Sequence, residues 1–417
     1  MTVSYSAGNL QELYDFYEDH LKRVLLPFWL RSTDEEDGGY FNCYDNTGAT
    51  LVSTDKYTWS QGRFVWMYAK LASMTTGTFS REERSRFLEL AGQGARFLMN
   101  HCLLENGNCT FVMDKKGNPK RNAPGDRYDS SIFADCFVIA GLSKYAAESG
   151  DAASLEFART LYGSVMERFR SGDYQMAPYP TPEESLPAVD ADQAGTGRLE
   201  HLRDNMKMFL HEITNHFMRE DGVLNEMLAA DNSRVDSLLG RYCNPGHTIE
   251  DMWFVIHAAR KLGLDAYIPK ALRTTKKMVE LGWDSEYGGL LLFVDQDGGQ
   301  PHGDLSGIEH TAMAGQIRQN WDNKLWWPHS EALYTTLLGY RLTRDDDFLR
   351  DYNRLHDYTF RTFPNPDESV GEWIQIRKRG GEPIDKVVAL PVKDPYHIIR
   401  NVIYIIELLH GMRGAEK

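Results

Sequence analysis

Two stretches of the chain share one order of residues: a side chain that can cap a helix, a proline, a spacer and a histidine. They are Asn244-Pro245-Gly246-His247 and Asp394-Pro395-Tyr396-His397. Asn and Asp are favoured N-caps and proline suits the first helical position, so each histidine is expected in the first turn of a helix. The partial positive charge at a helix N-terminus disfavours imidazolium, so both rings are expected to be neutral near pH 7 and able to accept a proton. His247 and His397 are therefore candidates for an acid/base pair.

An arginine and a third histidine are placed in a similar way. Ser60 is a potential N-cap for an apolar helix, which puts Arg63 in the first turn. A cation there is unfavourable unless a carboxylate or a ligand balances it, and a salt bridge to the acidic run 34–37 is the simpler alternative. Pro328 and His329 also begin an apolar run, although the tryptophans beside them equally suit core packing.

A carboxylate accompanies the first histidine, whereas a metal site is not supported. Glu250 follows His247 on the same helical face, where it can orient the ring or contact a substrate hydroxyl; a capping contact to a core histidine is the alternative. His211 and His216 resemble part of a zinc-binding helix, but their spacing separates them by roughly 140° around the helix axis. The sequence also has no phosphate-binding glycine loop. We therefore expect no metal and no nucleotide cofactor.

The composition restricts the class of protein. The formal net charge is -14 at pH 7 and the basic residues do not cluster, so nucleic acid and anionic membranes are unfavourable partners. No segment approaches the roughly 18 apolar residues that span a membrane, and the N-terminus has no secretion signal. Five scattered cysteines without a C-x-x-C pair favour reduced thiols. We expect a cytoplasmic protein without nucleic-acid or membrane partners.

The chain contains an internal repeat. Three landmarks recur with one constant offset, as the pairs Gly39/Gly289, Asp45/Asp295 and Gly48/Gly298. Each repeat combines a short hairpin, an apolar helix and an amphipathic helix. Such units close into a ring more readily than they form separate domains, so residues 1–417 are expected to form a single domain.

Helical periodicity predicts alternating inner and outer helices. Inner helices, apolar round much of their circumference, are expected at about 60–74, 129–148, 246–262, 326–342 and 395–411. Outer helices with one apolar stripe are expected at about 9–26, 82–100, 152–170, 265–281 and 346–362. If the inner helices run parallel, Arg63, His247, His329 and His397 meet at one rim. Residues 177–197 carry four prolines where a sixth inner helix should begin, and the next helix, 198–219, suits either layer.

With these residues in view, the chain resembles the N-acylglucosamine 2-epimerase family, which includes renin-binding-protein type, cellobiose and mannose 2-epimerases and related aldose-ketose isomerases. The resemblance covers most of the chain. Four segments carry it: Lys56 to Tyr68, Asn244 to Glu250, Lys324 to Ala332 and Lys393 to His397. It implies an all-α fold, the (α/α)6 barrel, with short β-hairpin loops on the active-site rim.

The resemblance also implies roles for individual residues. His247 and His397 match the acid/base pair of the family, Arg63 matches the residue that holds the sugar near its carbonyl end, and Glu250 matches a carboxylate that supports the first histidine. Aromatic rings near the predicted rim suit the apolar faces of sugars, with core packing as the alternative. The residues expected to bind the substrate are Tyr57, Trp59, Lys324, Trp326, His329, Glu331, Trp373 and Lys393. The chain departs from the family at 177–205, which leaves the identity of the sugar open.

The chemistry agrees with these residues. Epimerising C2 of an open-chain sugar removes a proton beside the carbonyl from one face and returns one to the other, which calls for two groups that titrate near neutrality. Arg63 suits the developing enolate oxygen. The expected function is therefore a 2-epimerase of the N-acylglucosamine/N-acylmannosamine type without metal or redox cofactor, a homodimer by resemblance, with any nucleotide effector unreadable from the sequence.

Three alternatives stay open. A mannose or cellobiose 2-epimerase, or an aldose-ketose isomerase, would use the same residues. A glycoside hydrolase-like enzyme would need two opposed carboxylates, such as Glu250 and Glu331. A non-catalytic protein-binding toroid would need neither the histidines nor the carboxylates.

Overall fold

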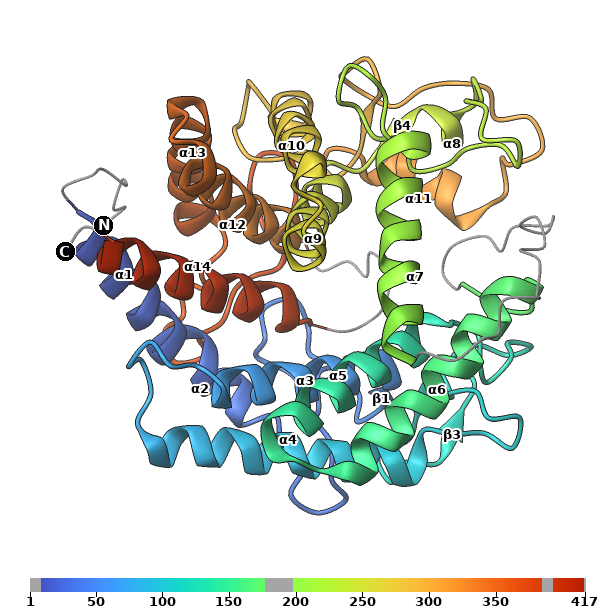
Figure 1. Ribbon diagram of the computed structural model, residues 1–417, viewed down its shortest axis with the longest axis vertical. Coiled ribbons are helices and arrows are strands. Elements are labelled where there is room, and N and C mark those ends of the chain that lie inside the picture. Colours follow the sequence, from blue (N-terminus) through green and yellow to red (C-terminus); the bar gives the residue numbers. More distant parts are fainter. Residues whose placement is uncertain (1–8, 177–197, 385–392, 416–417) are drawn as a thin grey trace. The chain divides into compact units, whose positions relative to one another are not determined.

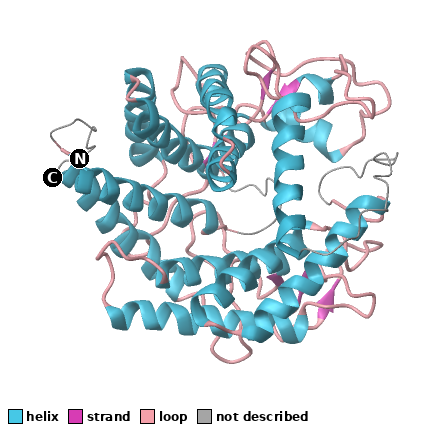
Figure 2. Cartoon of the chain, viewed as in Figure 1, coloured by secondary structure: helices cyan, strands magenta, loops and turns pink. Residues whose placement is uncertain are grey.

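The computed structural model describes residues 9–176, 198–384 and 393–415. Helices make up most of this part of the chain, and the strands are short (Figure 2). The chain divides into two compact units. Unit 1 holds the described residues of Met1–Leu13, Asp190–Pro364 and Ile374–Ile384, and unit 2 holds those of Tyr14–Val189, Asn365–Trp373 and Asp385–Lys417. That residues 1–417 form a single domain stays a prediction.

Unit 2 is built from helices in the first and last parts of the chain (Figure 1). In chain order they are α1 Leu10–Asp19, whose residues fall in both units, a π-helical turn His20–Leu25, α2 Leu26–Leu30, α3 Thr58–Ala72, α4 Arg81–His101, α5 Phe133–Ser149, α6 Ala152–Ser171 and α14 Tyr396–Ala415. The apolar helix α3 packs against α4, α5 and α14, and α5 packs against α6.

Unit 1 repeats this alternation in the second half of the chain. Its helices are α7 Arg198–Glu212, a π-helical turn Ile213–Phe217, α8 Leu238–Arg241, α9 Pro245–Leu262, a 3-10 turn Asp265–Tyr267, α10 Ile268–Gly282, α11 Ala312–Asn320, α12 Trp326–Thr343 and α13 Asp346–Thr362. The apolar helices α9 and α12 pack against each other, and each also packs against an amphipathic partner, α10 or α13. All five cysteines of the chain carry free thiols. None of the helices in the described ranges is long and apolar enough to cross a membrane.

The inner helices of unit 1 run parallel. The His247 ring stacks on Trp327 where α9 and α12 begin, with the ring centroids 5.0 Å apart. Further along both helices, Trp253 donates to Glu331 at 2.8 Å. Because the contacts advance in the same direction on both helices, their N-termini lie at one end.

The inner helices of unit 2 show the same order of contacts. The Arg63 guanidinium lies over the Tyr396 ring near the starts of α3 and α14, and Lys70 pairs with Glu407 further along. The backbones of α3 and α5 also approach closely, since an added Cβ on Gly62 would lie 2.3 Å from a main-chain oxygen of α5. The prediction of parallel inner helices is therefore confirmed within each unit.

Short strands lead the chain into these helices. β1 Lys56–Tyr57 pairs with β2 Val112–Met113, which also pairs with β3 Pro119–Lys120; β4 Tyr242–Cys243 pairs with β5 Val294–Asp295; and β6 Lys324–Leu325 pairs with β7 Ile376–Arg377. All four pairings are antiparallel. The strands β1, β4 and β6 end at the starts of α3, α9 and α12, which confirms the predicted short hairpins before inner helices.

The predicted internal repeat is present as one turn in both units. In unit 2, the Asp34 N–H donates to Gly39 O at 3.0 Å, and the buried Lys56 ammonium lies 2.8 Å from the Asp34 carboxylate. The equivalent residues of unit 1 are Asp284, Gly289 and Lys324, with distances of 2.9 and 3.0 Å. Gly39 and Gly289 both have φ of 75°, a left-handed conformation that favours glycine.

All ten predicted inner and outer helices overlap an observed helix, but two predicted starts are wrong. Ser60 is not an N-cap, because β1 leads directly into α3 and the helix begins earlier; Arg63 consequently lies in the second turn. Asp129 is not the cap of α5, which begins later in the chain. The Asp129 carboxylate instead binds Arg127 and Asn108, at 2.9 and 2.7 Å.

The segment 198–219 is now assigned by its connections. α7 and the π-helical turn lead into a hairpin closed by the Met218–Leu224 bridge, and that hairpin precedes α9. This is the connectivity of an outer helix. The short helix α11 was not predicted; it lies between Gly298 and Lys324, a segment that is longer than its counterpart between Gly48 and Lys56. The proline-rich residues 177–197 lie outside the described part of the chain.

Candidate active site

The start of α9 places His247 as the sequence predicted. Asn244 is the N-cap, and its side chain accepts the His247 N–H at 3.2 Å. Pro245 is the first residue of the helix. The imidazole of His247 is 36% exposed and is therefore accessible to a small molecule.

The environment of the His247 ring differs from the prediction. Burial lowers the pKa of this ring. The charge and hydrogen bond of Glu226, with the charges of Glu250 and Asp251, raise the pKa by more than burial lowers it, to about 8. The Glu226 Oε2 lies 3.3 Å from Nδ1. The prediction that helix polarity keeps this ring neutral near pH 7 is wrong, because nearby carboxylates outweigh the helix terminus. Near pH 7 the ring holds a proton that it can donate.

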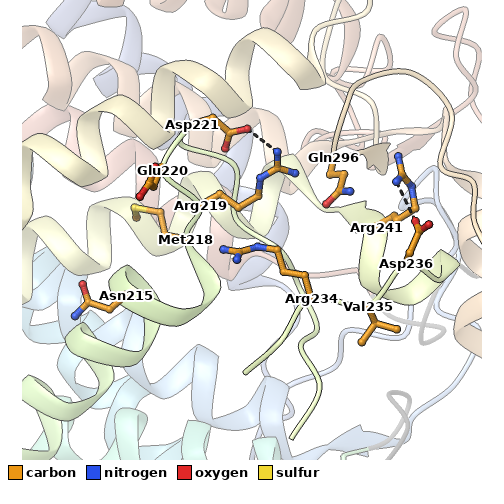
Figure 3. Close-up of a pocket in the computed structure, with 10 residues that line it drawn as sticks. All are labelled: Asn215, Met218, Arg219, Glu220, Asp221, Arg234, Val235, Asp236, Arg241 and Gln296. Carbon is orange, nitrogen blue, oxygen red and sulfur yellow. Dashed lines mark hydrogen bonds and ion pairs between the residues drawn. The ribbon is translucent and has the colours of Figure 1, made fainter. Parts of the chain in front are cut away.

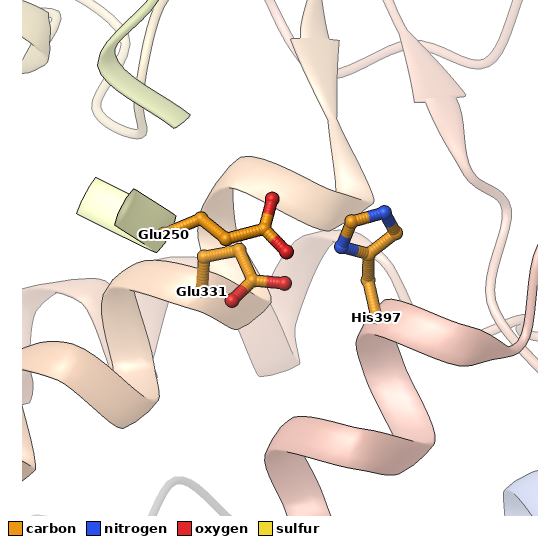
Figure 4. Close-up of side chains that lie close together, drawn as sticks. All are labelled: Glu250, Glu331 and His397. Carbon is orange, nitrogen blue, oxygen red and sulfur yellow. The ribbon is translucent and has the colours of Figure 1, made fainter. Parts of the chain in front are cut away.

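Two carboxyl groups of unit 1, those of Glu250 and Glu331, lie close together (Figure 4). Glu250 comes from α9 and Glu331 from α12, and the figure also draws His397 of unit 2 on α14. Glu331 is fully buried and accepts a hydrogen bond from Trp253. Burial, together with the charges of Glu226 and Glu250, raises the pKa of Asp251 to about 7. Unit 1 therefore has two groups with a pKa near neutrality, His247 and Asp251, near the start of α9.

His329 has a different environment from His247. It is fully buried, its Nδ1 lies 2.6 Å from Leu325 O, and its Nε2 accepts the Leu290 N–H at 2.8 Å. Burial, with the nearby charge of Lys324, lowers the pKa of His329 to about 3. Both ring nitrogens of this neutral histidine are used by the main chain, so neither is left for a sugar hydroxyl.

Lys324 and Trp326 lie where β6 leads into α12: Lys324 is the first residue of the strand and Trp326 the first residue of the helix. The Lys324 ammonium is fully buried and is bound by Asp284 and by Gly288 O, at 3.0 and 2.8 Å. Burial lowers the pKa of Lys324 to about 8. The Trp326 indole N–H is buried without a hydrogen-bond partner in unit 1 or elsewhere among the described residues. Of these two predicted substrate contacts, Trp326 is the one that offers an unused donor.

In unit 2, Arg63 is held by one carboxylate and three aromatic rings. Its guanidinium pairs with Asp394, just before α14. It also lies over the rings of Trp59, Phe137 and Tyr396, with distances of 4.6, 4.1 and 5.1 Å to the ring centroids. The alternative prediction, a salt bridge to the acidic run 34–37, is wrong because Lys56 takes Asp34. Cation–π contacts and the ion pair fix this cation in a buried setting.

His397 lies in the first turn of α14. Asp394 Oδ1 accepts the Tyr396 N–H at 2.7 Å, as expected of a capping side chain. The buried Arg400, one turn along α14, lies 3.4 Å from His397 Nδ1 through its Nη2. Because a guanidinium can only donate, this contact requires an unprotonated Nδ1.

The remaining predicted substrate contacts of unit 2 are buried. Tyr57 donates to Asn122 at 3.1 Å, and Trp373 donates to His20 Nε2 at 2.8 Å. Lys393 is bound by Glu372 at 2.9 Å. These contacts suit a scaffold that joins the hairpins to neighbouring segments of unit 2. Whether any of the three also reaches a sugar stays a prediction.

A cavity of about 800 Å³ lies in unit 1, and none of the predicted site residues lines it (Figure 3). It is lined by three arginines and three carboxylates, among others, and two of the arginines are paired: Arg219 with Asp221 at 2.7 Å, and Arg241 with Asp236 at 3.0 Å. Neither unit, taken alone over its described residues, brings three His, Cys, Asp or Glu side chains together as metal ligands.

Known structures share this fold. The cellobiose 2-epimerase from Bacillus thermoamylovorans B4167 has a TM-score of 0.74 and 18% identity, covering 95% of this chain and 99% of that chain. The cellobiose 2-epimerase from Spirochaeta thermophila DSM 6192 has a TM-score of 0.73 and 17% identity, covering 98% and 99%. The prediction of an all-α, (α/α)6-barrel fold is confirmed.

Characterised sequences are similar over almost the whole chain. The N-acylglucosamine 2-epimerase of Mus musculus is 30% identical over 418 residues, covering 95% of this chain and 91% of its own. The human N-acylglucosamine 2-epimerase is 28% identical, covering 94% and 89%. A helical barrel with such relatives defines a carbohydrate isomerase. Residues 39–401 match the N-acylglucosamine 2-epimerase (GlcNAc 2-epimerase) family, and the chain belongs to it.

Sequence reasoning missed Glu226, the residue that binds the His247 ring. It lies in the hairpin before α9, where the pattern shows only a short extended segment. One signal was available: in the equivalent position the other hairpins carry Asn42, Phe111, Leu292 and Gln375, so Glu226 is the only acid among the five.

Proposed function

We propose that this isomerase interconverts N-acylglucosamine and N-acylmannosamine by moving a proton at C2. The observation that carries the proposal is the start of α9, where a capped, accessible histidine is hydrogen-bonded to a carboxylate. The sequence relatives named N-acylglucosamine 2-epimerase, similar over most of the chain, support the N-acyl substrate class.

In the proposed reaction His397 removes the C2 proton of the open-chain sugar, and the C–H electron pair forms a C1–C2 enolate with the negative charge on O1. His247, which holds a proton near pH 7, donates it to the opposite face of C2, and the carbonyl re-forms. The reverse reaction exchanges the roles. A doubly protonated His397 ring can no longer accept from Arg400, so that contact breaks in the first step.

Arg63 is proposed to stabilise the charge that develops on O1. A cation fixed by Asp394 and by aromatic rings needs little reorganisation when the negative charge appears. Glu250 supports His247 through its charge. The reaction as proposed needs no metal or redox cofactor, and the protein is proposed to act in the cytoplasm as a homodimer.

Proton NMR in D2O tests this proposal. The purified protein is incubated with N-acetylglucosamine, N-acetylmannosamine, mannose, glucose and cellobiose. Loss of the C2 proton of an N-acetylated sugar, with appearance of its C2 epimer, is the expected result. His247→Asn and His397→Asn should each lower this exchange by at least about 100-fold, as expected for loss of an acid/base group. Exchange on none of the five sugars would overturn the proposal.

A second candidate is a 2-epimerase or aldose-ketose isomerase acting on free sugars. Solved structures with this fold include cellobiose 2-epimerases and a D-mannose isomerase, the latter with a TM-score of 0.70 and 16% identity over 97% of this chain. Epimerisation of cellobiose or mannose alone, or formation of a ketose, favours this candidate.

A carboxylate mechanism of hydrolase type predicts instead that Glu250→Gln abolishes activity while His397→Asn spares it.

A further inference from the structure

The Glu226 carboxylate connects two parts of the first turn of α9. Its Oε1 accepts the main-chain N–H of the N-cap residue Asn244 at 3.2 Å, and its Oε2 lies 3.3 Å from Nδ1 of His247. The Asn244 side chain in turn accepts the main-chain N–H of His247. One carboxylate, only 15% exposed, therefore contacts both the cap and the histidine ring.

Its neighbour Asn225 fixes the position of Glu226. Asn225 is fully buried, and its side-chain amide donates to Gly240 O and to Gln296 Oε1, both at 3.1 Å. The side-chain oxygen accepts from Arg234 at 3.3 Å. Arg234 and Gln296 line the cavity of unit 1 (Figure 3). The loop that carries Glu226 is thus tied to two other segments, and the carboxylate is presented to His247 by a rigid support.

These contacts determine which nitrogen of His247 can react. The Nδ1–H donates to Glu226, and the ring face lies on Trp327 with an interplanar angle of 29°. Nε2 is then the nitrogen left for a substrate. The charged groups of unit 1 that act on the ring are Glu226 from the hairpin and Glu250 and Asp251 from α9, and all three raise its pKa.

We propose that Glu226 is a positioning residue for proton transfer at C2: it orients the His247 ring so that Nε2 reacts, and it holds the ring in the protonated state that donates. This inference rests on the proposed function. The hairpin scaffold does not need an acid here, because the equivalent positions of the other hairpins carry Asn42, Phe111, Leu292 and Gln375. A carboxylate that orients a histidine through Nδ1 is a known means of setting its tautomer.

Three variants test the proposal. Glu226→Gln removes the charge and keeps the size, and Glu226→Asp keeps the charge but shortens the reach by one methylene. Glu220→Gln makes the same charge change on an exposed residue of the same hairpin and serves as the matched control. The imidazoles are labelled with 15N, His247 is assigned by comparison with His247→Asn, and its titration is followed by NMR without sugar.

In the wild type and in Glu220→Gln, the titration midpoint of His247 should lie near pH 8, and in Glu226→Gln it should fall toward 6.5. With the sugar that the wild type epimerises, kcat at pH 7 should fall at least about 10-fold in both Glu226 variants, with KM changed less than about threefold. Glu226→Asp should keep a midpoint above 6.5.

An unchanged midpoint in Glu226→Gln, or kcat within twofold of wild type in Glu226→Asp, would overturn the positioning role. If Glu226→Gln does not fold, Glu226→Asp decides the proposal through its kcat. A wild type that exchanges no sugar proton would overturn the proposed function instead. The NMR titration still reports in that case whether Glu226 controls the ring.

Discussion

His247 and His329 both lie near the start of an inner helix, yet their surroundings shift their proton affinities in opposite directions. Carboxylates raise the pKa of His247 to about 8, whereas burial lowers the pKa of His329 to about 3. Gln61 does in unit 2 what His329 does in unit 1: it accepts the N–H of the residue after the paired glycines, Tyr40, at 2.8 Å. His329 thus makes a scaffold contact at a position where a substrate-binding residue was predicted.

Part of this difference could be predicted from the sequence. The cap at Asn244 depends only on neighbouring residues, so its prediction was correct. Spacing does not separate the two roles, because His247, His329 and Gln61 each lie five residues after the first residue of the strand that leads into the helix (β4, β6 and β1). The acid at this hairpin position was the one sequence signal of Glu226, but its contact with the His247 ring could not be predicted, because that contact depends on how a distant hairpin is held.

Asp394→Asn tests the role of the pair that holds Arg63. The amide keeps an oxygen that can accept the Tyr396 N–H, but it removes the charge opposite the guanidinium. A cation displaced from its bound position should lower kcat/KM by about 10- to 100-fold. The control is Glu407→Gln, which removes the partner of Lys70 on the same two helices. Steady-state kinetics in which both variants lose activity equally would contradict the specific role of Asp394.

At the scale of elements, the contact between α3 and α5 depends on glycine. A Cβ on Gly62 would lie 2.3 Å from Phe137 O, a distance that no side-chain movement relieves. Gly62→Ala should therefore lower the free energy of unfolding by about 1–3 kcal/mol, because overpacking shifts the backbone. Gly163 in α6 has no atom within 4 Å of its added Cβ. Gly163→Ala should raise the stability by about 0.5–1 kcal/mol, as measured by thermal unfolding. Equal melting temperatures for the two variants would contradict the close approach.

The two repeated turns allow a comparison of buried ion pairs. Asp34 has Lys56 as its basic partner, whereas Asp284 binds both Lys324 and Arg379, at 3.0 and 2.8 Å. Lys56→Met leaves a buried carboxylate without a counter-charge and should cost about 3–5 kcal/mol of unfolding free energy. Lys324→Met should cost less, since Arg379 remains.

Urea denaturation of both variants, with the double variant Lys324→Met/Arg379→Met, measures this difference. The double variant should approach the cost of Lys56→Met. If Lys324→Met alone costs as much as Lys56→Met, Arg379 does not compensate the Asp284 charge.

Element boundaries were less predictable than the elements themselves. The helices were correctly placed because their apolar patterns extend over many residues. The starts at Ser60 and Asp129 were wrong because tertiary contacts override local capping preferences: β1 pairs directly before α3, and Arg127 holds the Asp129 carboxylate. Each predicted start differs from the observed start by only a few residues. Because α3 begins before Ser60, Arg63 lies in its second turn and not in its first.

At the scale of the whole molecule, the repeat explains why so much of the fold could be predicted. The same hairpin, paired glycines and buried lysine occur in both units, so one unit of pattern describes distant parts of the chain. Residues outside this pattern carry the individual chemistry. Glu226 replaces an apolar or neutral residue of the other hairpins, and Arg63 is held by an ion pair with α14 that no local pattern contains.

The stability of the molecule toward acid should depend on its buried histidines. Burial lowers the folded-state pKa of His329 to about 3, against 6.5 for an ordinary histidine, so the unfolded chain binds more protons below pH 6.5. The free energy of unfolding should then fall on acidification from pH 6.5 toward 3, by up to about 1.4 kcal/mol per pH unit for this one group.

The variant His329→Gln tests this dependence, because it removes the titrating ring. Its side chain can still accept the Leu290 N–H, as Gln61 accepts the Tyr40 N–H. It leaves Leu325 O without its donor, at a cost of about 1 kcal/mol at pH 7. In urea denaturation from pH 7 to 4.5, the stability curves of His329→Gln and wild type should therefore cross, whereas the exposed control His310→Gln should follow the wild type. A constant difference between His329→Gln and wild type over this range would show that His329 does not resist protonation in the folded protein.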